Sequence, residues 1–132
     1  MLFRSNTAGG NPAALVVRNS SISVSGVNKT NCQAFGVNSF GSPTALYNTA
    51  ISATVGSGCL AGVGLILQGG PSDLTFNNGA VTSTQYAIFN SSGTSKVRVG
   101  ASQLNAPFTV SGGAVCVGSF KSDYTATTAT CT

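Results

Sequence analysis

The sequence predicts an all-β protein and, within that class, a right-handed parallel β-helix of about four to five short coils. Three observations support this prediction. Short apolar runs end in Gly, Asn or Ser, the residues of turns. Apolar residues at i, i+3 and i+4 are not sustained, which argues against helices. The runs also recur at intervals typical of a solenoid. An antiparallel β-sandwich or jelly roll remains the alternative, because it too contains many short strands.

Nine runs of three to five residues have the composition of strands. In order they are Ala14–Val17, Ile22–Val24, Ala34–Val37, Ile51–Val55, Gly64–Leu67, Tyr86–Phe89, Lys96–Val99, Phe108–Val110 and Ala114–Val117. One segment, Pro43 to Ala50, has some helical character, with Ser42 at its cap position. Strand and turn are the preferred prediction there as well.

A repeat appears when the turn residue after successive apolar runs is aligned. The aligned residues are Asn19, Asn38, Gly69, Asn90 and Gly118, at intervals of 19, 31, 21 and 28 residues. A unit of this size cannot bury its own apolar side, but stacked units share a continuous core. Asn and Gly tolerate the left-handed backbone that tight corners need. These five residues are therefore predicted at coil corners.

Four cysteines occur at 32, 59, 116 and 131, without a CxxC pair and without any His in the chain. This pattern argues against zinc and favours two disulfides in an oxidising compartment. Three pairings exist on paper, and four buried free thiols are the alternative. Stacking of consecutive coils favours Cys32–Cys59, and fastening of the C-terminal tail favours Cys116–Cys131.

The domain prediction divides the chain into three parts. Residues 1–10 are expected to be disordered or foreign to the fold, 11–120 to form the β-solenoid, and 121–132 to form a tail tied by a disulfide. The first five residues are not followed by the apolar stretch of a signal peptide, and no run is long enough for a membrane-spanning helix. We therefore expect a fragment whose export segment lies upstream.

Charge is scarce: six Lys or Arg, two Asp and no Glu among 132 residues. Only Lys96 and Arg98 lie close together, so no nucleic-acid partner is expected. Asp73 and Asp123 are fifty residues apart and are interpreted as a turn residue and a solvated charge. Without His or Glu, the usual acid–base groups are missing. The prediction is therefore a non-enzyme with no catalytic, cofactor-binding or metal-binding residue.

The ten aromatic residues do not form an obvious ladder along the sequence. The tyrosines are scattered, at Tyr47, Tyr86 and Tyr124. Four phenylalanines lie within apolar runs and are expected in the core: Phe35, Phe76, Phe89 and Phe108.

Several phrases together resemble a known family. They are Ala13–Val17, Ser21–Gly26, Asn31-Cys32, Phe35–Ser39 and Thr44–Leu46. Over roughly residues 11 to 120 the chain resembles the C-terminal secreted region of TadE/G-like proteins of the Flp (Tad) pilus-assembly system, although the membrane segment of that family is missing here. The resemblance implies a non-enzymatic structural or assembly role at the bacterial envelope, in the periplasm or at the cell surface. Its partners would be envelope or pilus proteins, other copies of the chain included, with membrane attachment only through an upstream segment.

Two alternatives to this function stay open. One is a secreted adhesin or polysaccharide-binding module that holds carbohydrate along one solenoid face; a row of exposed aromatic side chains would favour it. The other is a self-assembling filament or capsid subunit.

Overall fold

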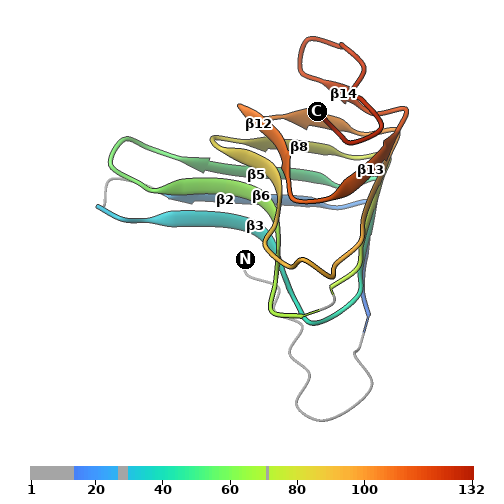
Figure 1. Cartoon of the computed structure of the whole chain (residues 1–132). Helices are drawn as coiled ribbons and strands as arrows, with labels where there is room; N and C mark the ends of the chain where they lie inside the picture. Colours follow the sequence, from blue (N-terminus) through green and yellow to red (C-terminus); the bar gives the residue numbers. More distant parts are fainter. Residues whose placement is uncertain (1–13, 27–29, 71) are drawn as a thin grey trace.

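The computed structural model describes residues 14–26, 30–70 and 72–132, and it is all-β, with no helix in these ranges (Figure 1). The expectation for residues 1–10 lies outside the described residues. None of the described segments could cross a lipid bilayer as a helix.

The strands form three sheets, each built from every third strand of the chain. Sheet 1 contains β1 (Leu15–Arg18), β4 (Thr44–Tyr47), β7 (Leu74–Asn77), β10 (Val97–Gly100) and β13 (Ala114–Val117). Sheet 2 contains β2 (Ser21–Gly26), β5 (Ala50–Val55), β8 (Ala80–Ser83), β11 (Gln103–Asn105) and β14 (Phe120–Lys121). Sheet 3 contains β3 (Gln33–Phe40), β6 (Ala61–Gln68), β9 (Tyr86–Asn90) and β12 (Phe108–Ser111).

The chain visits sheets 1, 2 and 3 in turn and then returns to sheet 1; we call each such passage a circuit. All strand pairs within the three sheets are parallel. The alternative of an antiparallel sandwich is therefore wrong for the described residues. Parallel pairing also explains why the apolar runs are short, since each strand covers only one side of a circuit.

The circuits become shorter toward the C-terminus. In sheet 1, Leu15 pairs with Thr44, Thr44 with Leu74, Leu74 with Val97 and Val97 with Ala114, which gives spacings of 29, 30, 23 and 17 residues. Every strand of sheet 1 has four residues, whereas those of sheet 3 shorten from eight to four. The strands of sheets 2 and 3 and the connections from sheet 3 to sheet 1, which shrink from residues 91–96 to 112–113 in the last circuits, therefore account for the irregular repeat of the sequence.

The corner between sheets 1 and 2 is built from residues with a left-handed backbone. They are Asn19, Asn48, Asn78, Ala101 and Gly118, with φ between 44° and 61°. Gly adopts this conformation freely, and Asn more readily than other side chains. The Asn48 side-chain amide also donates a hydrogen bond to the Asn19 side-chain oxygen at 3.0 Å, so adjacent circuits are linked at the corner.

Three of the five predicted corner residues lie elsewhere. Asn38 lies inside β3, because that strand continues to Phe40, and the prediction that it forms a corner is wrong. Gly69 follows β6 with φ 66°, at the corner between sheets 3 and 1. Asn90 is the last residue of β9 at the same edge. Of the five predicted corner residues, only Asn19 and Gly118 lie at the corner between sheets 1 and 2.

The thick part of the molecule, which we call the body, lies between sheet 1 and the facing ends of sheets 2 and 3. Its largest fully buried side chains include Leu46, Leu74, Phe76 and Leu104. Alternate residues of each sheet 1 strand point inward, as in Val97 and Val99, which are 2% exposed, on either side of exposed Arg98. The body thus holds the large side chains of one continuous core.

A thinner part, which we call the wing, extends from the body as two layers (Figure 1). One layer is β2, β5 and β8, and the other is the first halves of β3, β6 and β9. A Cβ atom on Gly62 would lie 2.5 Å from the carbonyl oxygen of Ala53, so backbone meets backbone there. Gly36 and Gly64 likewise leave room for Ile51 and Val81 of the other layer. Small residues on sheet 3 therefore bring the two layers together.

The cysteines lie in the two predicted pairs. Cys32 and Cys59 join the β2–β3 and β5–β6 connections at the tip of the wing, with Cα atoms 4.5 Å apart. Cys116 and Cys131 are paired in the body, with Cα atoms 5.1 Å apart, and Cys131 is completely buried.

The C-terminal tail folds back onto the last circuit. The Cys116 N–H donates to the Ala129 carbonyl at 2.9 Å, and the Thr127 N–H donates to the Ser119 carbonyl at 2.9 Å. Backbone groups of β13 that would otherwise form an open sheet edge are therefore partly satisfied by the tail.

Candidate binding surface

Each sheet presents one outward face, and the three faces differ in chemistry. A strand exposes alternate residues, and parallel pairing aligns the outward residues of successive circuits into rows. The three faces can therefore be compared row by row.

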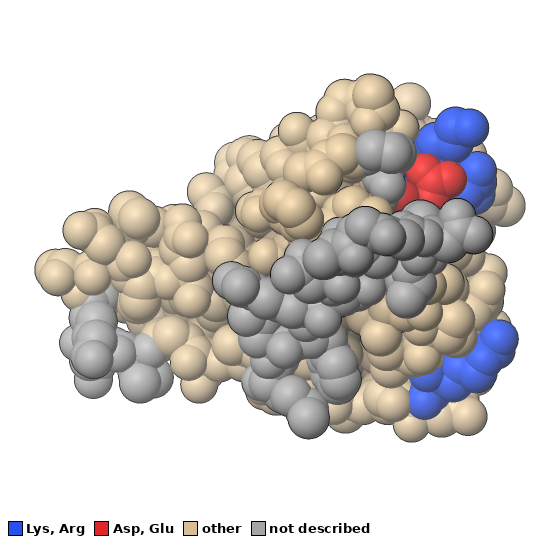
Figure 2. Space-filling model, turned by 90° about the horizontal axis from the view of Figure 1, so that it is seen from below, with Lys and Arg blue, Asp and Glu red and all other residues tan. Residues whose placement is uncertain are grey.

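Sheet 1 carries the charged side chains. The Arg98 guanidinium lies 3.9 Å from the Asp73 carboxylate, and the same carboxylate accepts the Lys96 N–H at 3.1 Å. Arg18 lies 4.3 Å from the centre of the Tyr47 ring, in cation–π contact. Figure 2 shows basic side chains in two groups at one end of the molecule, one beside an acidic side chain and one apart from it, while the other described surface in that view is uncharged. The charges of this face are few, and Arg98 and Arg18 each have a partner.

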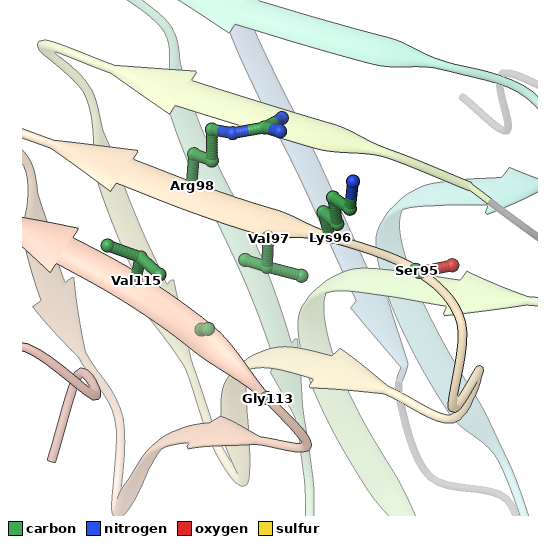
Figure 3. A pocket seen from close by; sticks show the side chains of 7 residues that line it. Ser95, Lys96, Val97, Arg98, Gly113 and Val115 are labelled. Atoms are coloured by element: carbon green, nitrogen blue, oxygen red, sulfur yellow. The ribbon is translucent and has the colours of Figure 1, made fainter.

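A shallow depression lies between β10 and β13 on this face, with Val115 at its base. Figure 3 shows Lys96 and Arg98 extending from β10 away from Val115 and toward the neighbouring strand. Lys96 and Arg98 thus line the depression on its β10 side, and the Arg98 guanidinium is paired with Asp73. The depression therefore does not concentrate positive charge as an anion-binding site does.

Sheet 2 presents small hydroxyl side chains. One row consists of Ser23, Ser52, Thr82 and Asn105. The next row contains Ser25 and Thr54, and the row on the other side contains Ala50, Ala80 and Gln103. The last of these rows continues to Phe120 of β14, whose ring stacks on exposed Tyr124 with centroids 5.6 Å apart; the other outward side chains of these rows are small or polar.

Sheet 3 gathers aromatic side chains. Its principal row contains Phe35, Val63, Tyr86 and Phe108, each paired with the next across adjacent strands. The parallel row contains Asn38, Ile66 and Phe89. The central strand β6 thus contributes aliphatic side chains, and its neighbours contribute rings.

The rings on β9 and β12 hold one another. Tyr86 stacks on Phe108 with centroids 5.0 Å apart, and meets Phe89 in a tilted arrangement at 5.2 Å. Such pairs add to the stability that area burial provides. The Tyr86 ring is therefore fixed by contacts on both sides before any ligand arrives.

This surface corrects the expected role of three phenylalanines. Phe76 is fully buried as predicted, but Phe108 is 54% exposed, and Phe35 and Phe89 are half-buried. They point outward because Ala34, Ala87 and Ile88 take the inward positions of these strands. The apolar runs that contain these rings therefore contribute side chains both to the core and to the outward face of sheet 3.

A groove of about 420 Å³ runs over β6 between these rings, and we call it the aromatic groove. Its lining residues are Gln33, Phe35, Ala61, Val63, Ile66, Gln68, Gln85, Tyr86 and Phe89. Ala61, Val63 and Ile66 lie at its base on β6, where Val63 and Ile66 are only 3% and 4% exposed; Phe35 on β3 flanks one side, and Tyr86 and Phe89 on β9 flank the other. Three glutamine amides complete the lining, and none of the nine residues carries a charge.

The two acidic residues serve local structure. Asp73 contacts Arg98 and the Lys96 N–H as described above. Asp123 accepts hydrogen bonds from the Thr125 hydroxyl at 2.6 Å and the Thr125 N–H at 3.0 Å, and these bonds hold the pKa of its carboxyl below the ordinary 3.8. Within the described ranges, no group of three metal-ligating side chains occurs.

Comparison with known proteins gave no match: neither a family model, nor a curated protein, nor a solved structure resembles the chain significantly.

Proposed function

We propose that the protein is a non-enzymatic, extracytoplasmic surface module of the adhesin type that binds its target through the aromatic groove. The groove itself is the observation that carries this proposal. It combines a concave shape, rings fixed in place and amide groups at its margins, which are features of binding sites that are formed before the ligand arrives. The depression on sheet 1 has a similar volume, about 470 Å³, but no aromatic side chain and no side-chain amide lines it.

The proposed architecture is a right-handed parallel β-helix of about five coils, with the three sheets as its sides. Parallel strands joined by a crossover have this handedness in nearly all proteins. The two cysteine pairs support an oxidising compartment, the periplasm or the cell surface, because disulfides persist there and are rare in the cytosol. A rigid, cross-linked module suits a surface role.

A second candidate is the structural or assembly role in a Tad-type pilus that the sequence resemblance implies. The fastened tail favours it as well, since a disulfide-closed end protects the last coil of an exposed solenoid. Genes for a pilus ATPase and a prepilin peptidase beside this gene would support the candidate. A neighbourhood without any pilus gene would count against it.

The adhesin proposal can be tested with protein-coated fluorescent beads and bacterial biofilm matrix. Beads that carry the wild-type chain should be retained, and beads that carry Ala61→Phe should be released, because the new ring fills the groove. Ala80→Phe is the matched control, since Ala80 also faces outward from a strand, on sheet 2. Equal retention of wild-type and Ala61→Phe beads would refute the proposal.

A further inference from the structure

Resting on the proposed binding function, we infer that the ligand of the aromatic groove is a neutral linear glycan that lies along β6. The inference follows from the dimensions of the groove, the pairing of β6, and the chemistry of the lining residues. Each of these removes a competing class of ligand.

The dimensions disfavour a helical partner. Phe35 on β3 and Tyr86 on β9 lie on either side of β6, two strand spacings apart, which is roughly 9.6 Å. An α-helix with its side chains has a diameter of about 10–12 Å, so it would rest on the rings and not enter between them. A protein partner would also need an interface of about 1,200–2,000 Å², which is larger than this hollow provides.

The pairing of β6 disfavours an extended peptide. A peptide strand is usually recognised by adding to a free sheet edge, where its backbone finds hydrogen-bond partners. β6 is paired with β3 on one side and with β9 on the other, so its backbone offers no free edge. A ligand over β6 must instead be held by side chains.

The lining chemistry fits a sugar. A pyranose ring has an apolar face of C–H groups and a rim of hydroxyls. The C–H groups are attracted to the electron-rich faces of rings such as Phe35 and Tyr86. Hydroxyls both donate and accept hydrogen bonds, as do the amides of Gln33, Gln68 and Gln85. No charged residue lines the groove, so an ionic ligand would find no counter-charge.

The length of the groove indicates a chain and not a single ring. Its floor runs from Ala61 to Gln68, and seven residue steps along a strand cover roughly 23 Å. Amides lie toward both ends, Gln33 and Gln85 near the start of β6 and Gln68 at its end. A linear glycan along β6 can therefore contact amides at both ends and rings between them.

The test uses the full chain and three neutral hexasaccharides, of β-linked glucose, of β-linked mannose and of N-acetylglucosamine, with hexagalacturonate as the charged comparison. Binding is measured by titration calorimetry and by tyrosine emission, to which Tyr86 contributes. We expect at least one neutral chain to bind and hexagalacturonate to bind at least tenfold more weakly.

Matched variants assign the site. Tyr86→Ala should weaken binding about tenfold, because it removes stacking and releases Phe89 and Phe108. Tyr47→Ala, which replaces a half-buried tyrosine on sheet 1, should leave the affinity for the glycan unchanged. Gln68→Ala should weaken binding several-fold, and Gln103→Ala on sheet 2 should not. Tyr86→Phe keeps the ring and should retain most of the affinity, which covers the case in which Tyr86→Ala does not fold.

The outcomes separate the two proposals. Neutral-glycan binding that falls in the groove variants alone supports both. Retention of wild-type beads and release of Ala61→Phe beads, with no binding of any hexasaccharide, would overturn the glycan inference and leave the binding function standing. Glycan binding unaffected by Tyr86→Ala, Gln68→Ala and Ala61→Phe would also overturn the inference. Failure of both the bead and the glycan assays would overturn both.

Discussion

The body and the wing use the same strands but are packed in opposite ways. In the body, side chains such as Phe76 and Leu46 fill the space between sheets. In the wing, Gly62 and Gly64 remove side chains so that the layers touch through their backbones and small residues. The size of the inward residues therefore sets the distance between sheets. Damage should follow from a smaller residue in the body and from a larger residue in the wing.

The largest expected effect is in the body. Phe76→Ala should lower the free energy of unfolding by about 3–5 kcal/mol, because Phe76 is fully buried and its loss leaves a cavity. Urea denaturation followed by circular dichroism measures the change. Phe108→Ala is the control: its ring is more than half exposed, so the loss should be much smaller. Equal losses for both variants would contradict the division into core and surface rings.

One disulfide lies in the wing and the other in the body, so removing each in turn compares the two parts of the molecule. Removing the Cys116–Cys131 disulfide, which closes a loop of 15 residues, should lower the free energy of unfolding by about 3 kcal/mol in the chain-entropy model. Removing the Cys32–Cys59 disulfide, which closes a loop of 27 residues, should lower it slightly more. Because Cys131 is buried in the body, substituting that pair also disturbs packing. The double Cys→Ser variant of the body should therefore be the less stable of the two in urea. The opposite order would show that loop entropy dominates.

Overpacking should damage the wing. Gly62→Ala would place a Cβ 2.5 Å from the Ala53 carbonyl oxygen and close to the Thr84 hydroxyl. The layers must then separate, at a cost of about 1–3 kcal/mol. Gly93→Ala, where a Cβ meets nothing within 4 Å, is the control and should change the urea midpoint little. A Gly62→Ala protein as stable as the wild type would refute the close packing of the layers.

A smaller effect is expected at the corner that joins sheets 1 and 2. Ala101 has φ 44°, a conformation that costs roughly 1–2 kcal/mol for a residue with a Cβ. Ala101→Gly removes this cost but adds the greater backbone entropy of glycine, about 0.5–1 kcal/mol. The expected net gain is up to about 1 kcal/mol, measured by thermal unfolding. Ala80→Gly in β8, which has no left-handed backbone, should destabilise and serves as the control.

The smallest effect concerns pH and lies in the tail. Because Thr125 lowers the pKa of Asp123, this carboxylate stabilises the folded state above pH 3.8, and the contribution is lost as the pH falls through the lower folded pKa. An NMR titration should place the Asp123 midpoint below 3.8, and Thr125→Val should move it back toward 3.8. A midpoint at or above 3.8 in the wild type would contradict the hydrogen bonds to Thr125.

The sequence predicted the strand class, the parallel pairing and both cysteine pairs, because alternation and spacing are local or nearly local signals. It did not predict the corner at Asn48, Asn78 and Ala101. An Asn after an apolar run has the same pattern whether the strand ends there or continues, as β3 does beyond Asn38. Ala101 carries no turn signal at all, and its N–H donates to the Val117 carbonyl of the next circuit at 2.9 Å.

The wing and the groove were also hidden in the sequence for physical reasons. Gly62 resembles a turn residue, but it lies inside β6 because the Ala53 carbonyl of the other layer occupies the space of a side chain. Phe35 and Tyr86 are fifty-one residues apart and meet across β6 only through the strand register. Small inward residues such as Ala34 and Ala87 beside the rings are the one local signal that could have indicated an outward aromatic face.

The constant four-residue strands of sheet 1 have a consequence for how the chain can tolerate insertions and deletions. Circuit length varies between 17 and 30 residues while the pairing of sheet 1 stays in register. Within one circuit, the strand of sheet 2 and the following strand of sheet 3 form the two layers of the wing. Residues gained or lost in both of these strands together change only how far the wing extends. A single residue gained or lost within Thr44–Tyr47 would instead turn Leu46 outward and expose the core. Length variation among natural variants of this protein should therefore be confined to the wing and to the connections from sheet 3 to sheet 1, which already differ between residues 91–96 and 112–113.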